Sequence, residues 1–282
     1  MHCLHDFASK KSLPVKDLDS RERFSIFYHN IFDYPLTFSE LIKWTPIRSP
    51  NVNAEVDCKN GYYFIKGRGG LIYKKTIRRR FYLSKIKIAV KASKIIGLIP
   101  EVKMVGLSGS LAMENASKDS DIDFIIVTGK GHLWTTRLMV YLILKLSGIG
   151  LRRPNNSRQK DKLCLNIWLD ESDLKWNKRD RNFYTAHEIL QIVPLINKQG
   201  TYEEFMWKNK WSLKFWPNVS EIKPIKNIVP STKPINLNFV ESLAFRLQYS
   251  YMESKRTNEV VTNTRAIFHP YNLSKKIVER YS

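Results

Sequence analysis

The chain has 282 residues, 43% of them hydrophobic and 12% aromatic, which is enough apolar side chain for a packed core and roughly one to three domains. Lys and Arg total 47 against 26 Asp and Glu, and the formal charge of +21 favours polyanionic partners such as nucleic acid or nucleotides, or else a solvated basic surface. Three cysteines far apart in sequence argue against a disulfide scaffold and indicate a reducing, cytoplasmic location, while the longest apolar segment is too short to cross a membrane.

Residues 1–73 are predicted to form a winged-helix-like module. Apolar spacing predicts two helices within residues 20–44, and the second begins at the capping box Thr37-x-x-Glu40. Asn60-Gly61 then predicts the turn of a β-hairpin. The interval where a recognition helix should lie holds two prolines and little helical periodicity, so we expect a structural or interaction module more than a DNA-binding one.

Residues 74–216 are predicted to form the second domain, and a long basic helix over residues 74–99 opens it. Leu83, Ile86 and Val90 mark its predicted apolar face, with lysines interspersed among them. We interpret it as a helix that packs on the core and keeps a solvated basic side. The alternative is that this basic side approaches an RNA or nucleotide partner.

The following elements alternate between strands and helices. Strands are predicted at residues 102–107, 122–127 and 163–169, and helices at residues 134–146, 181–192 and 201–214. A basic loop that begins at Arg152 precedes the third strand and either flanks the active face or lies in solvent. Prolines punctuate the chain after residue 216, and a final helix begins near Asn238, so residues 217–282 are expected to form a linker and a helical C-terminal region.

The segment VGLSGSLAMENASKDSDIDFIIV, residues 105–127, carries the most chemical information. Alternation along a strand puts Asp121 and Asp123 on the same face, where their charges repel unless a cation lies between them. A hard divalent ion such as Mg²⁺ suits two carboxylates and leaves positions open for phosphates. Gly109 allows close approach of the backbone, and Ser110 adds a hydroxyl donor at the start of a short helix. One end of the segment can therefore hold a triphosphate and the other its metal.

This segment resembles the signature of the DNA polymerase β-like nucleotidyltransferase superfamily, in its minimal bacterial and archaeal form. The resemblance covers residues 102–169, and the wider layout is similar to a group of uncharacterised proteins with nucleotidyltransferase domains. It implies an α+β fold, in which helices flank a small mixed β-sheet. It also implies that Gly109, Ser110 and Ser120 bind an NTP and that Asp121 and Asp123 bind Mg²⁺.

The superfamily usually adds a third carboxylate on the next strand, and here the third predicted strand departs from that pattern. Cys164, Asn166, Trp168 and Asp170 share one face by alternation, and the central position holds Asn166. An amide cannot act as a general base. Asp170 lies about 13 Å further along the strand. Either Asp170 is the third catalytic residue beside Asp121 and Asp123, or the enzyme is impaired.

The first functional hypothesis is a Mg²⁺-dependent enzyme that transfers a nucleoside monophosphate from an NTP to an RNA, protein or small-molecule hydroxyl and releases pyrophosphate. The second is a catalytically impaired scaffold that binds nucleotide or nucleic acid, and the third is a DNA-binding regulator. His187 and Glu188, adjacent on a helix, point about 100° apart and are interpreted as capping, core or surface residues.

Overall fold

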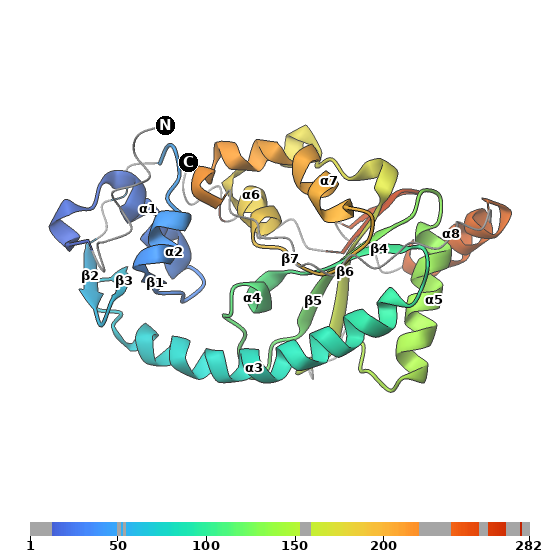
Figure 1. Cartoon of the computed structure of the whole chain (residues 1–282), viewed down its shortest axis with the longest axis horizontal. Helices are drawn as coiled ribbons and strands as arrows, with labels where there is room; N and C mark the ends of the chain where they lie inside the picture. The colour runs from blue at the N-terminus through green and yellow to red at the C-terminus, as the bar shows by residue number, and fades with distance from the viewer. Residues whose placement is uncertain are drawn as a thin grey trace. The chain divides into compact units, whose positions relative to one another are not determined.

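The computed structural model describes residues 13–49, 52, 55–152, 159–219, 238–253, 259–268 and 277 (Figure 1). They fall into two compact units. Unit 1 contains residues 13–77 and 211–219, and unit 2 contains residues 78–210 and the described residues from 238 onward. Both units combine helices with a β-sheet, so the predicted α+β class is confirmed. No helix in this described part of the chain is both long and apolar enough to cross a membrane.

Unit 1 is built on a three-stranded antiparallel sheet with the strand order β1-β3-β2. Its elements are the 3₁₀ turn Val15–Asp17, α1 (Ser20–Asn30), β1 (Leu36–Thr37), α2 (Phe38–Lys43), β2 (Val56–Lys59), β3 (Tyr62–Ile65), and the 3₁₀ turns Lys210–Lys214 and Pro217–Val219 at its second segment. The capping box of Thr37 and Glu40 begins α2 as predicted. Asn60 and Gly61 both adopt positive φ in the β2–β3 hairpin, as a tight two-residue turn requires.

The winged-helix assignment of this unit is not confirmed. Helix, helix and hairpin follow in the predicted order, but no helix is found among the described residues between α2 and β2. The core of the unit also includes Trp216, which the sequence analysis had placed at the far end of the second domain. Its indole packs against the rings of Phe24, Tyr28 and Trp44. The aromatic residues of unit 1 therefore pack around a tryptophan that follows them by 172 to 192 positions in sequence.

Unit 2 is built on a six-stranded mixed sheet with the order β7-β4-β5-β6-β9-β8. Helix α3 (Gly70–Gly97) begins in unit 1, and its part from Arg78 onward belongs to unit 2. The other elements of unit 2 are β4 (Val102–Leu107), α4 (Gly109–Ala112), β5 (Ile122–Thr128), α5 (Leu133–Leu146), β6 (Leu163–Asp170), 3₁₀ turns at Glu171–Asp173 and Lys178–Asp180, α6 (Phe183–Leu190), β7 (Val193–Asn197), α7 (Thr201–Lys208), α8 (Asn238–Glu253), β8 (Val260–Val261) and β9 (Arg265–Ile267). Strands β5 and β6 pair in parallel and the other neighbours antiparallel. Side chains of α3, α5 and α8 join the buried cluster on the sheet, and α6 and α7 lie on its other side (Figure 1).

Three strands of this sheet were absent from the sequence-based prediction. Residues 181–192 were predicted as one helix, but α6 ends at Leu190 and strand β7 follows. The sheet tolerates Pro194 in β7 because β7 is an edge strand, where a missing N–H donor costs no hydrogen bond between strands. The helical C-terminal region is corrected as well. Helix α8 is present, yet β8 and β9 then join the sheet beside β6. Strands of two and three residues are too short to show a hydrophobic period.

The most deeply buried face of α3 is not the predicted apolar one, although Ile86 of that face packs against the core. Leu83 is 55% exposed, whereas Ala89, Ala92 and Ile96 are completely buried against the sheet, in line with Lys85. Alanine side chains allow the helix to approach the sheet closely, and a buried lysine is tolerated where its charge has a partner. The helix does pack on the core, but through a face that hydrophobicity alone did not identify.

Helix α8 is tied to α5 through a carboxylate at the start of α5. Glu241 accepts hydrogen bonds from the backbone N–H groups of Trp134 and Thr135, at 2.6 and 2.9 Å, and from the Thr135 hydroxyl at 2.6 Å. These donors are among the amides that a helix leaves unsatisfied at its first turn. A residue more than 100 positions away in sequence thus caps α5 and attaches α8 to the sheet.

Candidate functional site

The Ser-Gly-Ser turn and the two aspartates meet where β4 ends and β5 begins. Leu107 pairs with Phe124, and the backbone N–H of Ser108 donates to the carbonyl of Asp123 at 3.0 Å. The chain then makes a single short helical turn, α4, before it returns to β5. The antiparallel pairing of β4 with β5 therefore brings the predicted phosphate-binding and metal-binding halves of the motif to one edge of the sheet, as the sequence analysis expected.

Gly109 lies directly against the carboxylate of Asp123. Its φ is +62°, a conformation that glycine adopts at low cost, and a Cβ placed on it would lie 2.5 Å from Oδ2 of Asp123. The neighbouring Ser108 side chain is 4% exposed, and its hydroxyl has no hydrogen-bond partner among the described groups. The turn thus combines a close approach of the backbone to a carboxylate with a buried hydroxyl that has no partner among the described groups.

Asp121, Asp123 and Cys164 form a cluster whose ligand atoms all lie within 4.8 Å of one another. Asn166 of β6 donates from Nδ2 to Oδ1 of Asp123 and accepts from the Cys164 thiol at 2.6 Å. Arg152 donates to Asp121 at 2.9 Å and contacts the Cys164 sulfur at 3.3 Å. The guanidinium is therefore a cation beside the two carboxylates, as their mutual repulsion requires.

Burial dominates the electrostatics of this cluster. Burial, and then the negative charge of Asp121, together raise the pKa of Asp123 to about 7, against the opposing effect of Arg152. Burial, followed by the charge of Asp123, raises the pKa of the Cys164 thiol to about 12. Cys164 is consequently a protonated donor and a poor ligand for a hard cation.

Two members of the cluster, Asp121 and Asp123, could hold a magnesium ion. Asp121 and Asp123 supply the hard oxygen atoms that Mg²⁺ prefers, and an ion of this kind keeps the rest of its coordination sphere for waters and substrate phosphates. A cation between the carboxylates would also offset the desolvation that raises the pKa of Asp123. Arg152 pairs with Oδ2 of Asp121 at 2.9 Å, so a metal at this carboxylate would share it with the guanidinium.

Asp170 is not part of this cluster. The parallel register pairs Asp123 with Cys164 and Thr128 with Asp170, which places Asp170 at the opposite end of β6. Its carboxylate is completely buried and accepts from the backbone N–H of Gly131 at 2.6 Å and of Ser172 at 2.8 Å. Asp170 therefore anchors two loops, and the structure does not bring it to Asp121 and Asp123 as the proposed third catalytic carboxylate. The central residue of that strand facing Asp123 is Asn166.

Ser120 contributes to the site through its backbone. Its hydroxyl donates to the carbonyl of Ser117 at 3.0 Å, and its own carbonyl accepts from Lys85 Nζ at 2.7 Å. Lys85, which is 1% exposed, also pairs with Asp161 at 2.6 Å. This buried ammonium fixes the loop that leads into Asp121.

Replacing Lys85 with methionine is expected to lower the free energy of unfolding by about 1–3 kcal/mol, because the Asp161 carboxylate and the Ser120 carbonyl lose a charged donor. Chemical denaturation of the full chain measures the change. Lys87→Met on the exposed side of α3 is the matched control, expected to stay within about 0.5 kcal/mol of the wild type. Equal losses in both variants would contradict the role assigned to Lys85.

Glu188 is a residue of this site that the sequence analysis did not identify. Helix α6 leads into β7, whose first residue Val193 pairs with Leu107 just before the Ser-Gly-Ser turn. Burial, and then the charge of Asp123, raises the pKa of Glu188 to about 7, while Gln191 donates to its carboxylate at 2.8 Å. Tyr184, one helical turn earlier, has its pKa raised by burial and by the charges of Glu188 and Asp123.

The signal that could have identified Glu188 is its i, i+4 spacing from Tyr184, which puts both side chains on one face of α6. The sequence analysis considered the adjacent pair His187 and Glu188 instead. It also left open whether Arg152 lies at the active face, and the structure brings this residue to Asp121. Residues 153–158 of the same basic loop lie outside the described residues.

No protein-family model matches the chain, and no curated protein matches it in sequence. The class that the fold and the site define is an α+β protein with a pair of aspartates and a glycine turn at one edge of a mixed sheet.

Proposed function

We propose that unit 2 is a Mg²⁺-dependent nucleotidyltransferase. It transfers a nucleoside monophosphate from an NTP to a hydroxyl acceptor and releases pyrophosphate. The observation that carries this proposal is the approach of Gly109 to the carboxylate of Asp123 beside Asp121, since a phosphate-binding turn next to paired metal ligands is what this chemistry needs. The likeness of residues 105–127 to the polymerase β-like signature supports the same conclusion.

In this proposal Asp121 and Asp123 hold the metal, which neutralises charge on the phosphates during transfer. The Gly109–Ser110 turn binds the phosphates through backbone N–H and hydroxyl groups. The acceptor oxygen bonds to the α-phosphorus while the bond from that phosphorus to the bridging oxygen of pyrophosphate breaks. Glu188 is the carboxylate available to take the acceptor's proton, because a pKa of about 7 suits a base at neutral pH.

A second function, a nucleotide-binding scaffold without turnover, is favoured by the residue next to Asp123 on β6. Asn166 occupies the position where the superfamily carries its third carboxylate, and Asp170 is at the far end of the strand. Arg152 also satisfies the charge of Asp121 without a metal. Such a site would bind a nucleotide through the turn without transfer, and Glu188 would not act as a base.

The two functions are separated by incubating the full chain with each NTP, labelled at its α-phosphate, together with Mg²⁺ and fractionated cell extract. Transfer of the label to RNA, protein or a small molecule, with matching release of pyrophosphate, supports the transferase. Binding of an NTP without release of pyrophosphate in any fraction supports the scaffold. Absence of both binding and turnover with all four NTPs contradicts both functions.

A further inference from the structure

Helix α3 carries an unbalanced positive charge. Between Gly70 and Gly97 it contains no Asp or Glu, while its cations are Lys74, Lys75, Arg78, Arg79, Arg80, Lys85, Lys87, Lys91 and Lys94. Such a segment gains no stability from i, i+4 ion pairs and accumulates repulsion along its length. Anionic or hydrogen-bonding partners for these cations must therefore come from other parts of the molecule or from a bound ligand.

Some of these cations have partners within the described residues. Lys74 pairs with Asp33, Lys75 with Glu40, and Lys85 with Asp161, and Arg78 donates to the Asn115 amide. The remaining cations are all exposed, and none forms an ion pair or hydrogen bond within the part of the chain that the structure describes; they are Arg79, Arg80, Lys87, Lys91 and Lys94.

Four of the unpaired cations lie in a single row. Arg80, Lys87, Lys91 and Lys94 are spaced at i, i+7, i+11 and i+14, which places them within an arc of about 60° on the helix. The row extends for about 21 Å at the helical rise, and it lies opposite the buried side that contains Lys85 and Ala89. We name these four residues the α3 basic row.

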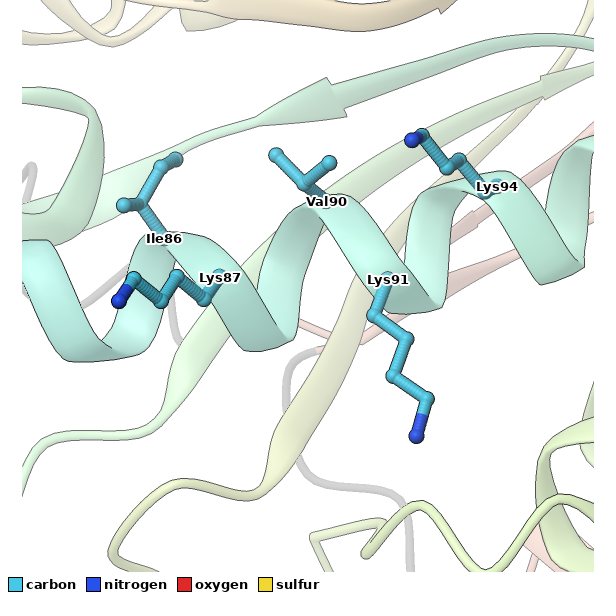
Figure 2. A pocket seen from close by; sticks show the side chains of 5 residues that line it. All are labelled: Ile86, Lys87, Val90, Lys91 and Lys94. Atoms are coloured by element: carbon cyan, nitrogen blue, oxygen red, sulfur yellow. The ribbon is translucent and has the colours of Figure 1, made fainter.

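Apolar side chains border the α3 basic row. Ile86 and Val90 are half-buried beside Lys87, Lys91 and Lys94, and the five side chains line a shallow hollow of about 430 Å³ (Figure 2). Leu83, which is 55% exposed, continues the apolar border one turn earlier. A row of cations next to an apolar strip can contact a phosphate backbone and the bases attached to it at the same time.

We propose that the α3 basic row and its apolar border bind single-stranded RNA. The lysines and Arg80 contact successive phosphates, and Leu83, Ile86 and Val90 pack against unstacked bases. The chain's formal charge of +21 favours this polyanion as a whole, and α3 concentrates the charge on one exposed surface. This inference goes beyond the proposed function, because binding at this surface does not require the metal, Asp121 or Asp123.

The geometry favours single-stranded RNA over two other polyanionic partners. A duplex hides the faces of its bases, so the apolar border would contact nothing on it, whereas single-stranded RNA exposes unstacked bases beside its phosphates. A helix that lies on a membrane buries an apolar face flanked by cations. In α3 the centre of the exposed face is cationic, and Ile86 and Val90 are partly covered by the fold.

The test measures binding of fluorescein-labelled, mixed-sequence single-stranded RNA to the full chain by anisotropy over a range of salt concentrations. The triple variant Lys87→Gln, Lys91→Gln and Lys94→Gln is expected to weaken binding about tenfold or more and to reduce the slope of log K against log salt by about 2, since each lost phosphate contact removes about 0.7. Circular dichroism confirms that the variant is folded.

The matched control removes the same charge from exposed lysines elsewhere in unit 2, through Lys145→Gln, Lys175→Gln and Lys178→Gln. It is expected to retain most of the affinity and the full salt slope, and replacing the three α3 lysines with arginine is expected to retain binding. Equal losses in the α3 and control variants would show that net charge alone attracts RNA, and would overturn the proposal.

Single-stranded DNA, duplex DNA and phosphatidylserine vesicles are compared in the same assay. The proposal holds when RNA binds more tightly than each of them and loses the most affinity in the α3 variant. It is overturned when another of these partners binds as tightly through the same lysines, or when RNA shows no measurable binding. The α3 variant is expected to bind NTP and Mg²⁺ at the Asp121–Asp123 site as the wild type does, so failure here is distinct from failure of the proposed transferase.

Discussion

Asp123→Asn is expected to lower Mg²⁺-dependent NTP turnover about 1000-fold. The amide keeps the size of the side chain and can still accept the hydrogen bond from Asn166, but it supplies no charge to hold a metal beside Asp121. Several kcal/mol of stabilisation of the transition state depend on such an ion, and each 1.36 kcal/mol corresponds to a factor of ten in rate. Pyrophosphate release with saturating NTP, Mg²⁺ and the extract fraction that supplies the acceptor measures the loss.

The same substitution is expected to stabilise the metal-free protein at pH 8. The folded pKa of Asp123, about 7, lies above its ordinary value of 3.8, so the stability linked to this group is present at pH below about 4 and is lost as the pH rises through 7. Asparagine carries no ionisable proton, so the variant does not lose stability as the pH rises. We expect its free energy of unfolding at pH 8 to exceed that of the wild type by about 1–2 kcal/mol. Added Mg²⁺ should stabilise the wild type but not the variant.

The control for this substitution is Asp119→Asn, which makes the same chemical change on an exposed residue of the same loop. It is expected to leave both turnover and stability close to the wild-type values. Wild-type turnover in the Asp123→Asn variant would contradict the assignment of the metal site, whereas lost turnover together with lost stability would indicate a folding defect and not a missing ligand.

Gly109→Ala is expected to destabilise the chain by about 2–3 kcal/mol and to reduce NTP turnover at least about tenfold. A Cβ at this position would lie 2.5 Å from Oδ2 and 3.2 Å from Cγ of Asp123, so the carboxylate has to move. The positive φ of Gly109 adds the cost of a left-handed conformation for alanine. Displacing the carboxylate alters the metal site and the phosphate turn together.

Gly148→Ala provides the matched control. Gly148 also has a positive φ, +70°, but a Cβ there meets no atom within 4 Å. Gly148→Ala is expected to lower the free energy of unfolding by about 1 kcal/mol, the cost of the left-handed backbone alone, and to leave turnover unchanged. The difference between the two variants in thermal unfolding and in turnover isolates the contact between Gly109 and Asp123. Equal behaviour of the two variants would show that this contact has no role.

The strands nearest the motif were predictable because their signals are local. The β4 prediction matches the structure at both ends, and the β5 and β6 predictions each end one residue early. Each is a buried apolar run bounded by turn residues, which a period of two or a continuous hydrophobic stretch reveals. The capping box at Thr37 and the turn at Asn60-Gly61 were found for the same reason, since a few neighbouring residues determine each of them.

The core face of α3 could not be predicted from hydrophobicity. Lys85 can be buried because its ammonium donates hydrogen bonds to the Asp161 carboxylate and the Ser120 carbonyl. Both partners come from segments that follow it by 35 residues or more. Leu83, the more apolar residue, is left exposed. A helical pattern shows that one face is apolar, but the element packed against the helix decides which face is buried.

The sequence by itself determined the α+β class, the strands around residues 105–127, and the same-face placement of Asp121 and Asp123, because alternation along a strand depends only on local geometry. Only the tertiary structure decided which other residues join them. Asn166 contacts Asp123 through the pairing of β6 with β5, and Arg152, from the segment before β6, contacts Asp121. Glu188, on the helix that leads into β7, comes near enough for the charge of Asp123 to raise its pKa. Asp170 is kept away by the same register, since strand pairing fixes positions across the sheet that sequence spacing does not encode.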